Sequence, residues 1–463
     1  MRTLLLLDPM MRQLYSRLTA RFYSMASVQS WKLFFVPKLR RIAEFLASQG
    51  ITTAGNLLYG FLCVRLLPIS DYAEYAVVFG FLGTLTVLMD IGISSSLLPL
   101  IGERVGDSQL IADYVASLRQ LSHWLYIAAI PVVAVAYPFL VHRQRWNLRT
   151  VAVMVAILLV AGWSARVSGA YGAVLIVRRD HSIWYRVQMI ASLGTLSLLG
   201  AIWSLHWFNA FSAILINIAG IVFTGSAYFI RAHRLLGVVG RPSKEKRKAI
   251  VHLAMPTMPN TLFYAFQGQA SMLLITWFGS STAVAGLGAL GRLNRVFILL
   301  AQMNPLLIEP YFAKLPAPRL KRNYLGLLAL EACFCLIVTA AAARAPELFL
   351  WVLGPRYADL RFEVLLLIAA ASMGHLCEVL WTVNTARRFV YWWNGAITIF
   401  YTLAVEIAFV WKVDLSTVRA VLAMSLVTGL GILIVNVLSG IYGFVHGPRA
   451  TIIASAEQRP EPV

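Results

Sequence analysis

An all-α polytopic membrane protein is the fold class that the sequence predicts, with about twelve transmembrane helices in two pseudo-symmetric six-helix lobes. Three observations predict it. The 463-residue chain is 59% hydrophobic and only 13% charged, with a mean hydropathy of +0.72, whereas roughly a quarter of the residues in soluble domains are charged. Apolar runs of about 18 or more residues, each long enough to span the hydrocarbon core of a bilayer, recur along it. A basic block near the middle divides these runs into two groups of six.

The first segment, residues 1–43, is rich in arginine and lysine. A membrane-surface helix would suit this composition. The other reading is that the native chain starts later, because Met10, Met11 and Met25 are also candidate start sites. We expect the segment to be cytoplasmic.

The two lobes follow from the apolar runs. In the first lobe, residues 44–230, the predicted spans are 45–67, 72–99, 121–141, 150–176, 186–205 and 209–230. In the second lobe, residues 257–446, they are 257–278, 283–308, 324–344, 362–384, 391–411 and 418–445. Six spans return the chain to the side from which it started, so both lobes enter the membrane in the same direction. Parallel repeats about an axis along the membrane normal have this arrangement.

The basic block forms the predicted linker, residues 231–256, between the lobes. Its cationic residues are Arg231, Arg234, Arg241, Lys244, Lys246, Arg247 and Lys248. Such a block marks a cytoplasmic face and is attracted to anionic phospholipid. The distribution of lysine and arginine over the other connections places both termini, including the tail 447–463, in the cytoplasm. We expect the length of the linker to let the lobes rock.

Several functions are excluded or disfavoured by composition. A net charge of +20 would suggest nucleic-acid binding in a soluble protein, but membrane loops account for it here and no soluble domain could read bases. The four cysteines lie in apolar surroundings, which predicts packing rather than disulfides or a metal site. The chain has no Gly-rich phosphate loop, metal cluster or nucleophile motif, so we expect neither enzyme activity nor a cofactor.

The segment from Gln49 to Arg104 carries a family resemblance. An apolar helix ends at Arg65-Leu66-Leu67, an acidic-aromatic pair follows at Asp71-Tyr72, and a second helix leads to Asp90-Ile91-Gly92. This pattern resembles the opening helix pair of the polysaccharide and O-antigen (Wzx-like) flippases of the MOP superfamily, to which MATE transporters are related. Ala73 departs from it, because the family often has glycine there.

Two later segments agree with the resemblance. Gln267-Gly-Gln269 resembles the polar pair that opens the second half in this family, and the segment from Glu347 to Tyr357 resembles its hydrophobic run followed by Gly-x-x-Tyr. The resemblance implies a MATE-like fold of two six-helix lobes. It also implies translocation of undecaprenyl-diphosphate-linked oligosaccharides across the bacterial inner membrane, for exopolysaccharide or O-antigen synthesis. The partners implied are the lipid-linked oligosaccharide, a polysaccharide polymerase and a chain-length regulator.

Arginines inside predicted spans are the candidate substrate-binding residues. Arg292 and Arg295 are three residues apart on one helix, so they share a face and could hold the implied diphosphate through paired hydrogen bonds. The alternative is a structural ion pair with an acid on another helix. Arg166 is the counterpart in the first lobe, although snorkelling to the interface competes with that role. Gln267 and Gln269 are candidates for the sugar passage. Because they are two residues apart on one helix, they cannot both face the passage squarely.

Buried acids are the candidates for ion coupling. They are Asp90, Glu331, Glu378 and Glu406. Each is expected either to pair with an arginine or to exchange H⁺ or Na⁺ during transport. His375 lies three residues before Glu378, a spacing that suits a proton relay or a buried hydrogen bond.

Two other functions remain open from the sequence. A multidrug exporter of the same superfamily would bind organic cations, which a cationic site repels. A membrane-embedded polysaccharide polymerase or glycosyltransferase would carry a long outer loop with catalytic groups, and the longest such connection expected here, 345–361, is short.

Overall fold

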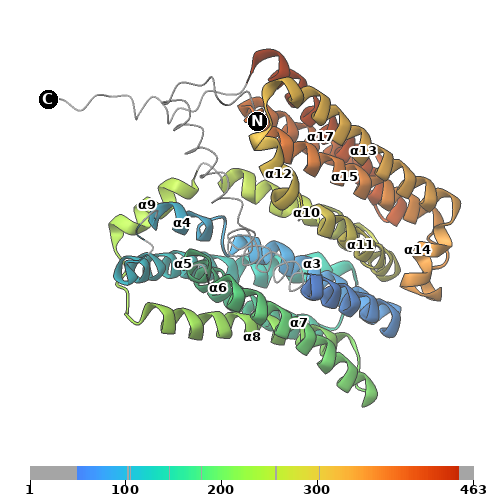
Figure 1. Cartoon of the computed structure of the whole chain (residues 1–463). Coiled ribbons are helices and arrows are strands. Elements are labelled where there is room, and N and C mark those ends of the chain that lie inside the picture. Colours follow the sequence, from blue (N-terminus) through green and yellow to red (C-terminus); the bar gives the residue numbers. More distant parts are fainter. Residues whose placement is uncertain are drawn as a thin grey trace, which may run out of the picture.

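The computed structural model describes residues 50–447 with gaps at 102–103, 105, 145, 179, 256–257 and 302. The basic segment 1–43 and residues 448–463 of the predicted tail lie outside this part of the chain. Within it, all regular secondary structure is helical (Figure 1). The predicted all-α membrane fold is therefore confirmed.

Each predicted span corresponds to a helical segment. The first lobe contains helical residues 50–66, α3 (Ile69–Leu88), α5 (Ser108–Val141), α6 (Leu148–Val177), α7 (His181–Ser204) and α8 (Ala210–Leu236). The second contains α10 (Met258–Phe278), α11 (Ser281–Ala301), α13 (Ala317–Arg344), α15 (Arg361–Ala386), α16 (Trp392–Lys412) and α17 (Val418–His446). Of the described helices, 9 are long and apolar enough to cross a membrane, so the count of twelve spans stays a prediction.

Short helices occupy the two ends of the bundle. The end that we call the α9 end carries η2 (Ser94–Ser96), α4 (Leu97–Ile101), α9 (Lys244–Ala254) and α12 (Asn304–Lys314). The opposite end, the α14 end, carries η3 (His142–Gln144), α14 (Pro346–Leu353) and η4 (Pro355–Tyr357). Figure 1 shows α9 and α14 at opposite ends of the molecule.

The second predicted span, 72–99, is too long. Helix α3 ends at Leu88, and Ile91 and Gly92 turn the chain with φ angles of 43° and 79°. Glycine adopts such a left-handed conformation without steric cost. The Asp90 carboxylate accepts a hydrogen bond of 2.8 Å from the Ser94 amide and so closes this turn. The prediction that Asp90 lies inside a span is therefore wrong.

The eighth predicted span, 283–308, is also divided. Helix α11 ends at Ala301 and a separate helix, α12, begins at Asn304 with Pro305 in its first turn. Proline has no amide hydrogen to donate to the preceding turn, so it is favoured at a helix start and disrupts a helix interior.

One extensive hydrophobic cluster joins the two lobes and reaches the α14 end. It contains Leu67 and Tyr72 of the first lobe together with Leu290, Leu353 and Tyr357 of the second. At the α9 end, two described clusters belong to one lobe each, the one with Ile111 in the first lobe and the one with Phe312 in the second. A third, small cluster joins the first lobe and the linker to Met258 of α10. Apolar packing between the lobes is thus extensive toward the α14 end and slight at the α9 end.

The predicted linker, 231–256, is a docked element rather than a free tether. Helix α8 extends through its first residues to Leu236, Gly237 ends that helix with a φ of 64°, and α9 covers Lys244–Ala254. Ile250 of α9 is buried with Ile93 and Leu118 of the first lobe. The reason for the difference is that α9 is amphipathic and buries its apolar side against α5 and the turn after α3.

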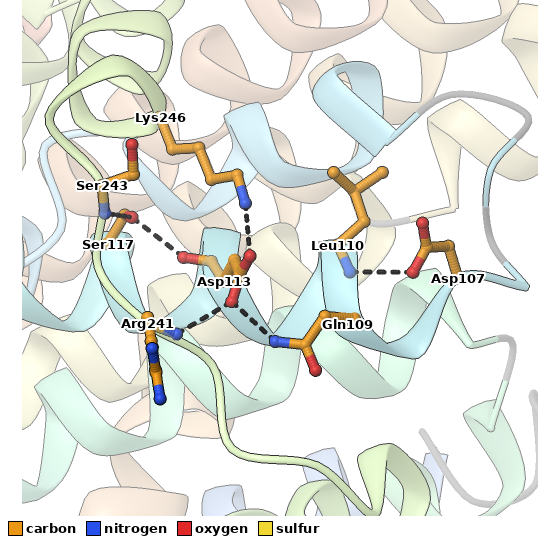
Figure 2. A network of polar contacts seen from close by, with 8 residues as sticks. All are labelled: Asp107, Gln109, Leu110, Asp113, Ser117, Arg241, Ser243 and Lys246. Carbon is orange, nitrogen blue, oxygen red and sulfur yellow. Dashed lines mark hydrogen bonds and ion pairs between the residues drawn. The ribbon is translucent and has the colours of Figure 1, made fainter.

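Asp113 of α5 holds this linker in place. Figure 2 shows its carboxylate accepting hydrogen bonds from the Arg241 amide (2.8 Å), Lys246 Nζ (2.5 Å) and Gln109 Nε2 (3.0 Å). One helical turn further along, Ser117 Oγ accepts a bond of 3.1 Å from the Ser243 amide. Part of the linker charge is therefore bound to protein.

Gly240 lets the linker backbone approach α5 closely. A Cβ atom at this position would lie 1.9 Å from the carbonyl oxygen of Ala112. No other residue type fits such an approach without a shift of the backbone. The linker thus follows a fixed path over the first lobe.

We predict that Asp113→Ala releases the linker. Trypsin should then cleave between residues 241 and 248 several-fold faster than in the wild type, because exposed, locally unfolded backbone is the preferred site of proteolysis. Glu245→Ala, which removes an acid of α9 that makes no ion pair among the described residues, is the matched control and should be cleaved at the wild-type rate. Equal rates for all three proteins would show that Asp113 does not hold the linker.

Candidate functional site

Helices α3, α10 and α11 form the contact between the lobes (Figure 1). Small residues allow these helices to approach: Gly288 of α11 packs against Ala76 of α3, and Gly80 of α3 packs against Met272 of α10. Small residues are typical of close helix contacts in membranes, where van der Waals packing replaces the hydrophobic effect. This interface positions the strongest candidate residues.

Arg292 of α11 is enclosed in the interface. Its relative exposure is 9%, and its Nε atom donates a hydrogen bond of 3.2 Å to the hydroxyl of Tyr72 on α3. The guanidinium carbon lies 5.3 Å and 4.9 Å from the ring centroids of Tyr75 and Phe79, within the range of cation–π attraction. No described carboxylate forms an ion pair with it.

Gly60 leaves the space that Arg292 fills. A Cβ atom at residue 60 would lie 3.0 Å from Cδ and 3.1 Å from Nη1 of Arg292. The first helix of one lobe therefore lacks a side chain where α11 of the other lobe inserts a long cationic one. Arg292 consequently contacts residues that come from two helices of the opposite lobe.

Arg295 differs from Arg292 in its accessibility. Its guanidinium carbon lies 5.9 Å from the centroid of Phe79, so both arginines flank the same ring, as their predicted shared face requires. The Arg295 side chain is exposed and forms no ion pair with any described acid. A planar guanidinium with several free donors can bind a phosphate oxygen pair. Arg295 is therefore the accessible cation, with the charge of Arg292 beside it.

Polar contacts between the lobes close the α14 end. Arg65 Nε donates a bond of 3.0 Å to the carbonyl of Val352, and its Nη2 donates to the carbonyl of Trp351. In the reverse direction, Arg356 Nη1 donates to the carbonyl of Leu67. Each lobe thus contributes an arginine that binds backbone carbonyls of the other.

Gln144 provides a second polar contact at the same end. Its Nε2 donates to the carbonyls of Thr276 and Gly279 at 2.9 Å and 3.0 Å, and its Oε1 accepts from Ser281 Oγ at 2.8 Å. Aromatic packing accompanies these bonds, since the ring of Phe139 stacks on Trp277. We call the contacts made by Arg65, Arg356 and Gln144 the clasp.

The predicted glutamine pair is divided. Gln269 packs against α3 at Gly83, where the missing side chain leaves room for it. A Cβ atom at Gly83 would lie 2.9 Å from Gln269 Nε2. Gln267 instead lines a cavity of about 530 Å³ between α10 and α16, together with Glu406. The two residues therefore lie in different surroundings.

Arg166 is separate from the arginines of the interface. It lines a cavity formed by α5, α6 and α8, to which the second lobe contributes no described lining residue. The prediction that Arg166 is the first-lobe counterpart of Arg292 in one substrate site is therefore not supported by the geometry.

The predicted relay between His375 and Glu378 does not form. His375 Nε2 lies 3.1 Å from Glu331 Oε2, so α15 and α13 are joined by this pair inside the second lobe. The side chain of Glu378 is exposed. The difference arises because α13 packs directly on α15 and offers a nearer acceptor.

Several residues of the interface were not among the predicted site residues. Tyr72, Tyr75 and Phe79 recur at helical spacing on one face of α3, a signal that sequence alone contains. Gly60 and Gln144 give no such signal, because their partners lie more than a hundred residues away in the chain.

The chain resembles known proteins in structure but not in sequence. No protein-family model matches the chain, and no curated protein matches its sequence. A multidrug resistance MATE family transporter of the MOP superfamily, in an inward-facing conformation, matches with a TM-score of 0.60 and 17% identity over 88% of this chain and 96% of that one. The lipid II flippase MurJ, in an inward closed conformation, matches with a TM-score of 0.61 and 10% identity over 90% and 93%.

The chain has the fold of MOP-superfamily transporters. An outward-facing conformation of a MATE family transporter matches with a TM-score of 0.54 and 17% identity over 88% of this chain and 94% of that one. At these identities the likeness establishes the fold of a multi-pass membrane protein.

We predict that Tyr72→Phe destabilises the protein by about 1–3 kcal/mol, because it leaves the buried Arg292 without its hydroxyl acceptor. The control is Tyr357→Phe, which removes a buried hydroxyl that has no hydrogen-bond partner and should change the free energy of unfolding much less. Denaturant titration of both variants in detergent measures the difference. Equal losses would mean that the Tyr72 hydroxyl does not stabilise Arg292.

Proposed function

We propose that the protein flips an undecaprenyl-diphosphate-linked oligosaccharide across the bacterial inner membrane by alternating access of its two lobes. The observation that carries the proposal is the exposed guanidinium of Arg295 beside the enclosed Arg292, between the lobes of a transporter fold. The motifs of the opening helix pair and the fold shared with a lipid II flippase support it.

The charge of the site favours an anionic substrate. A diphosphate presents several oxygen acceptors, which the forked donors of an arginine bind with directional, charge-assisted hydrogen bonds. An organic cation would instead meet two positive charges and be repelled. This contrast favours a lipid diphosphate over the substrates of a multidrug exporter.

The conformation supports entry from the α9 end. The clasp and the shared core close the α14 end, whereas the described apolar contact between the lobes at the α9 end is limited to the small cluster that includes Met258. The higher TM-score against the inward-facing transporter, 0.60 against 0.54, is in keeping with this arrangement. With the basic linker at the cytoplasmic face, the described state would receive substrate from the cytoplasmic leaflet.

Ion coupling belongs to the second lobe in this proposal. His375 Nε2 and Glu331 Oε2 lie 3.1 Å apart where α13 packs on α15, and an ionisable pair between membrane helices is a candidate for ion exchange. Glu406 lies in an apolar cavity with Gln267. We propose H⁺ or Na⁺ as the coupled ion, and a polysaccharide polymerase and chain-length regulator as the partners that use the flipped product.

We predict that Arg295→Ala lowers the flipping rate by about tenfold or more, since hydrogen bonds to a charged partner are among the strong ones. Vesicles containing the protein and the lipid-linked oligosaccharide, with a glycan-cleaving enzyme added outside, measure the flipped fraction. The control, Arg361→Ala, removes an exposed arginine paired with Glu347 at the α14 end. It should flip at the wild-type rate.

The same vesicles distinguish the competing functions. Unchanged flipping by Arg295→Ala would remove this residue from the mechanism, and export of an organic cation without flipping would support the multidrug alternative. In the native host, deletion should cause lipid-linked repeat units to accumulate on the cytoplasmic leaflet. Failure to assemble the repeat units would instead support a membrane enzyme.

We also predict that closing the clasp covalently stops transport. In a variant whose four cysteines are replaced by alanine, Gln144→Cys and Ser281→Cys introduce thiols in place of side chains that lie 2.8 Å apart. A bis-methanethiosulfonate crosslinker, which can bridge the gap that two shorter cysteine side chains leave, should link them and abolish flipping, and a reducing agent should restore it. The variant with Gln144→Cys alone should be insensitive to the crosslinker. Full activity of the crosslinked double variant would contradict alternating access through this end.

A further inference from the structure

A second cationic site lies on the first lobe, away from the interface. Its cavity of about 980 Å³ is bounded by α5, α6 and α8 and by Pro242 of the linker. On α6, Gly162 faces Leu85 of α3, whereas the cavity-lining Trp163 and Val167 project from another side of the helix. Since α3 carries the contact with the second lobe, the cavity opens on the face that a membrane would surround.

Two arginines and a histidine are the basic residues of the described lining. They are Arg119, Arg166 and His123, and no described lining residue is acidic. Arg166 has a relative exposure of only 6%, and its Nε atom has no hydrogen-bond partner. A buried cation with an unused donor is costly unless an anion pairs with it. The site therefore lacks the negative charge that its composition requires.

The orientation of these groups is fixed. The Arg166 guanidinium carbon lies 3.8 Å from the ring centroid of Trp163, and its Nη1 atom donates a long bond of 3.4 Å to the carbonyl of Arg119. Arg119 Nη1 donates to the hydroxyl of Tyr171 at 3.2 Å. Both guanidinium groups keep further donors that no described residue uses.

The remainder of the lining suits hydrocarbon. Trp163, Phe229 and Ile230 are exposed apolar side chains at the cavity. Arg119 lies just before the predicted span 121–141 and Ile230 ends the predicted span 209–230, which places the cavity at the level of lipid headgroups. An amphiphile would thus meet cations at its polar part and apolar side chains beyond it. Basic pockets between transmembrane helices commonly bind anionic headgroups.

We propose that this cavity binds the phosphate headgroup of an anionic phospholipid from the leaflet at the α9 end. The phosphate accepts hydrogen bonds from Arg119 and Arg166, and an acyl chain lies along Trp163 and Phe229. The linker is part of the site, because Pro242 lines the cavity and Arg247 donates a hydrogen bond to Gln120, another lining residue. The assignment does not depend on the identity of the transported substrate.

Native mass spectrometry of the full-length protein tests this assignment with phosphatidylglycerol and phosphatidylcholine of identical acyl chains. A single phosphatidylglycerol molecule should bind at least about tenfold more tightly than phosphatidylcholine. The reason is that charge-assisted hydrogen bonds to a phosphate without a neutralising choline are stronger than those to a phosphate that has one. Arg119→Ala/Arg166→Ala should abolish this preference. The control Arg234→Ala/Lys248→Ala removes two exposed cations at the same end of the molecule and should retain it.

Three results would overturn the assignment. The first is an equal loss of preference in both double variants, which would reflect overall charge. The second is displacement of phosphatidylglycerol by inorganic phosphate, which would indicate a site for free anions. The third is displacement by undecaprenyl diphosphate that depends on Arg119 but not on Arg295, which would make this a substrate site. Should the double variant fail to fold, Arg119→Ala alone should still weaken phosphatidylglycerol binding severalfold.

Discussion

The enclosure of Arg292 between the lobes constrains much of the surrounding sequence. Removing a guanidinium from water is costly, and the described residues supply no carboxylate to offset it. They supply instead the hydroxyl of Tyr72 and the ring faces of Tyr75 and Phe79, which attract a cation without neutralising it. Gly60 provides the necessary space. The interface therefore keeps a net positive charge in the middle of the protein, beside the more accessible Arg295.

Most of the architecture could be predicted from hydropathy, because a bilayer demands apolar helices of a definite length. The predictions were wrong where interactions other than hydropathy determine where a helix ends or how a segment packs. The break after Leu88 depends on Gly92 and on the Asp90 carboxylate, and hydropathy registers neither. The docking of the linker depends on Asp113, an acid more than a hundred residues earlier in the chain. Charge patterns singled out the linker segment but could not show that part of its charge binds protein.

The candidate site was predictable only in part, for a related reason. An arginine within an apolar helix is conspicuous in any sequence, so Arg292, Arg295 and Arg166 could all be selected. Their separation into an interface pair and an outer cavity depends on which helices are neighbours. The pairing of His375 with Glu331 likewise replaced a relay inferred from spacing along one helix. Local periodicity identifies the face on which a residue lies but not the helix that it meets.

The unequal distribution of the hydrophobic core sets an energetic bias on any cycle of opening and closing. Parting the α14 end would expose the extensive apolar surface that both lobes now share there, whereas the described cluster that both lobes share at the α9 end is small. The described state is thus the resting state expected in the absence of cargo. A ligand shifts such an equilibrium only by its differential affinity for the two states. Cargo or coupled ion must therefore bind the opposite state more tightly to drive each turnover.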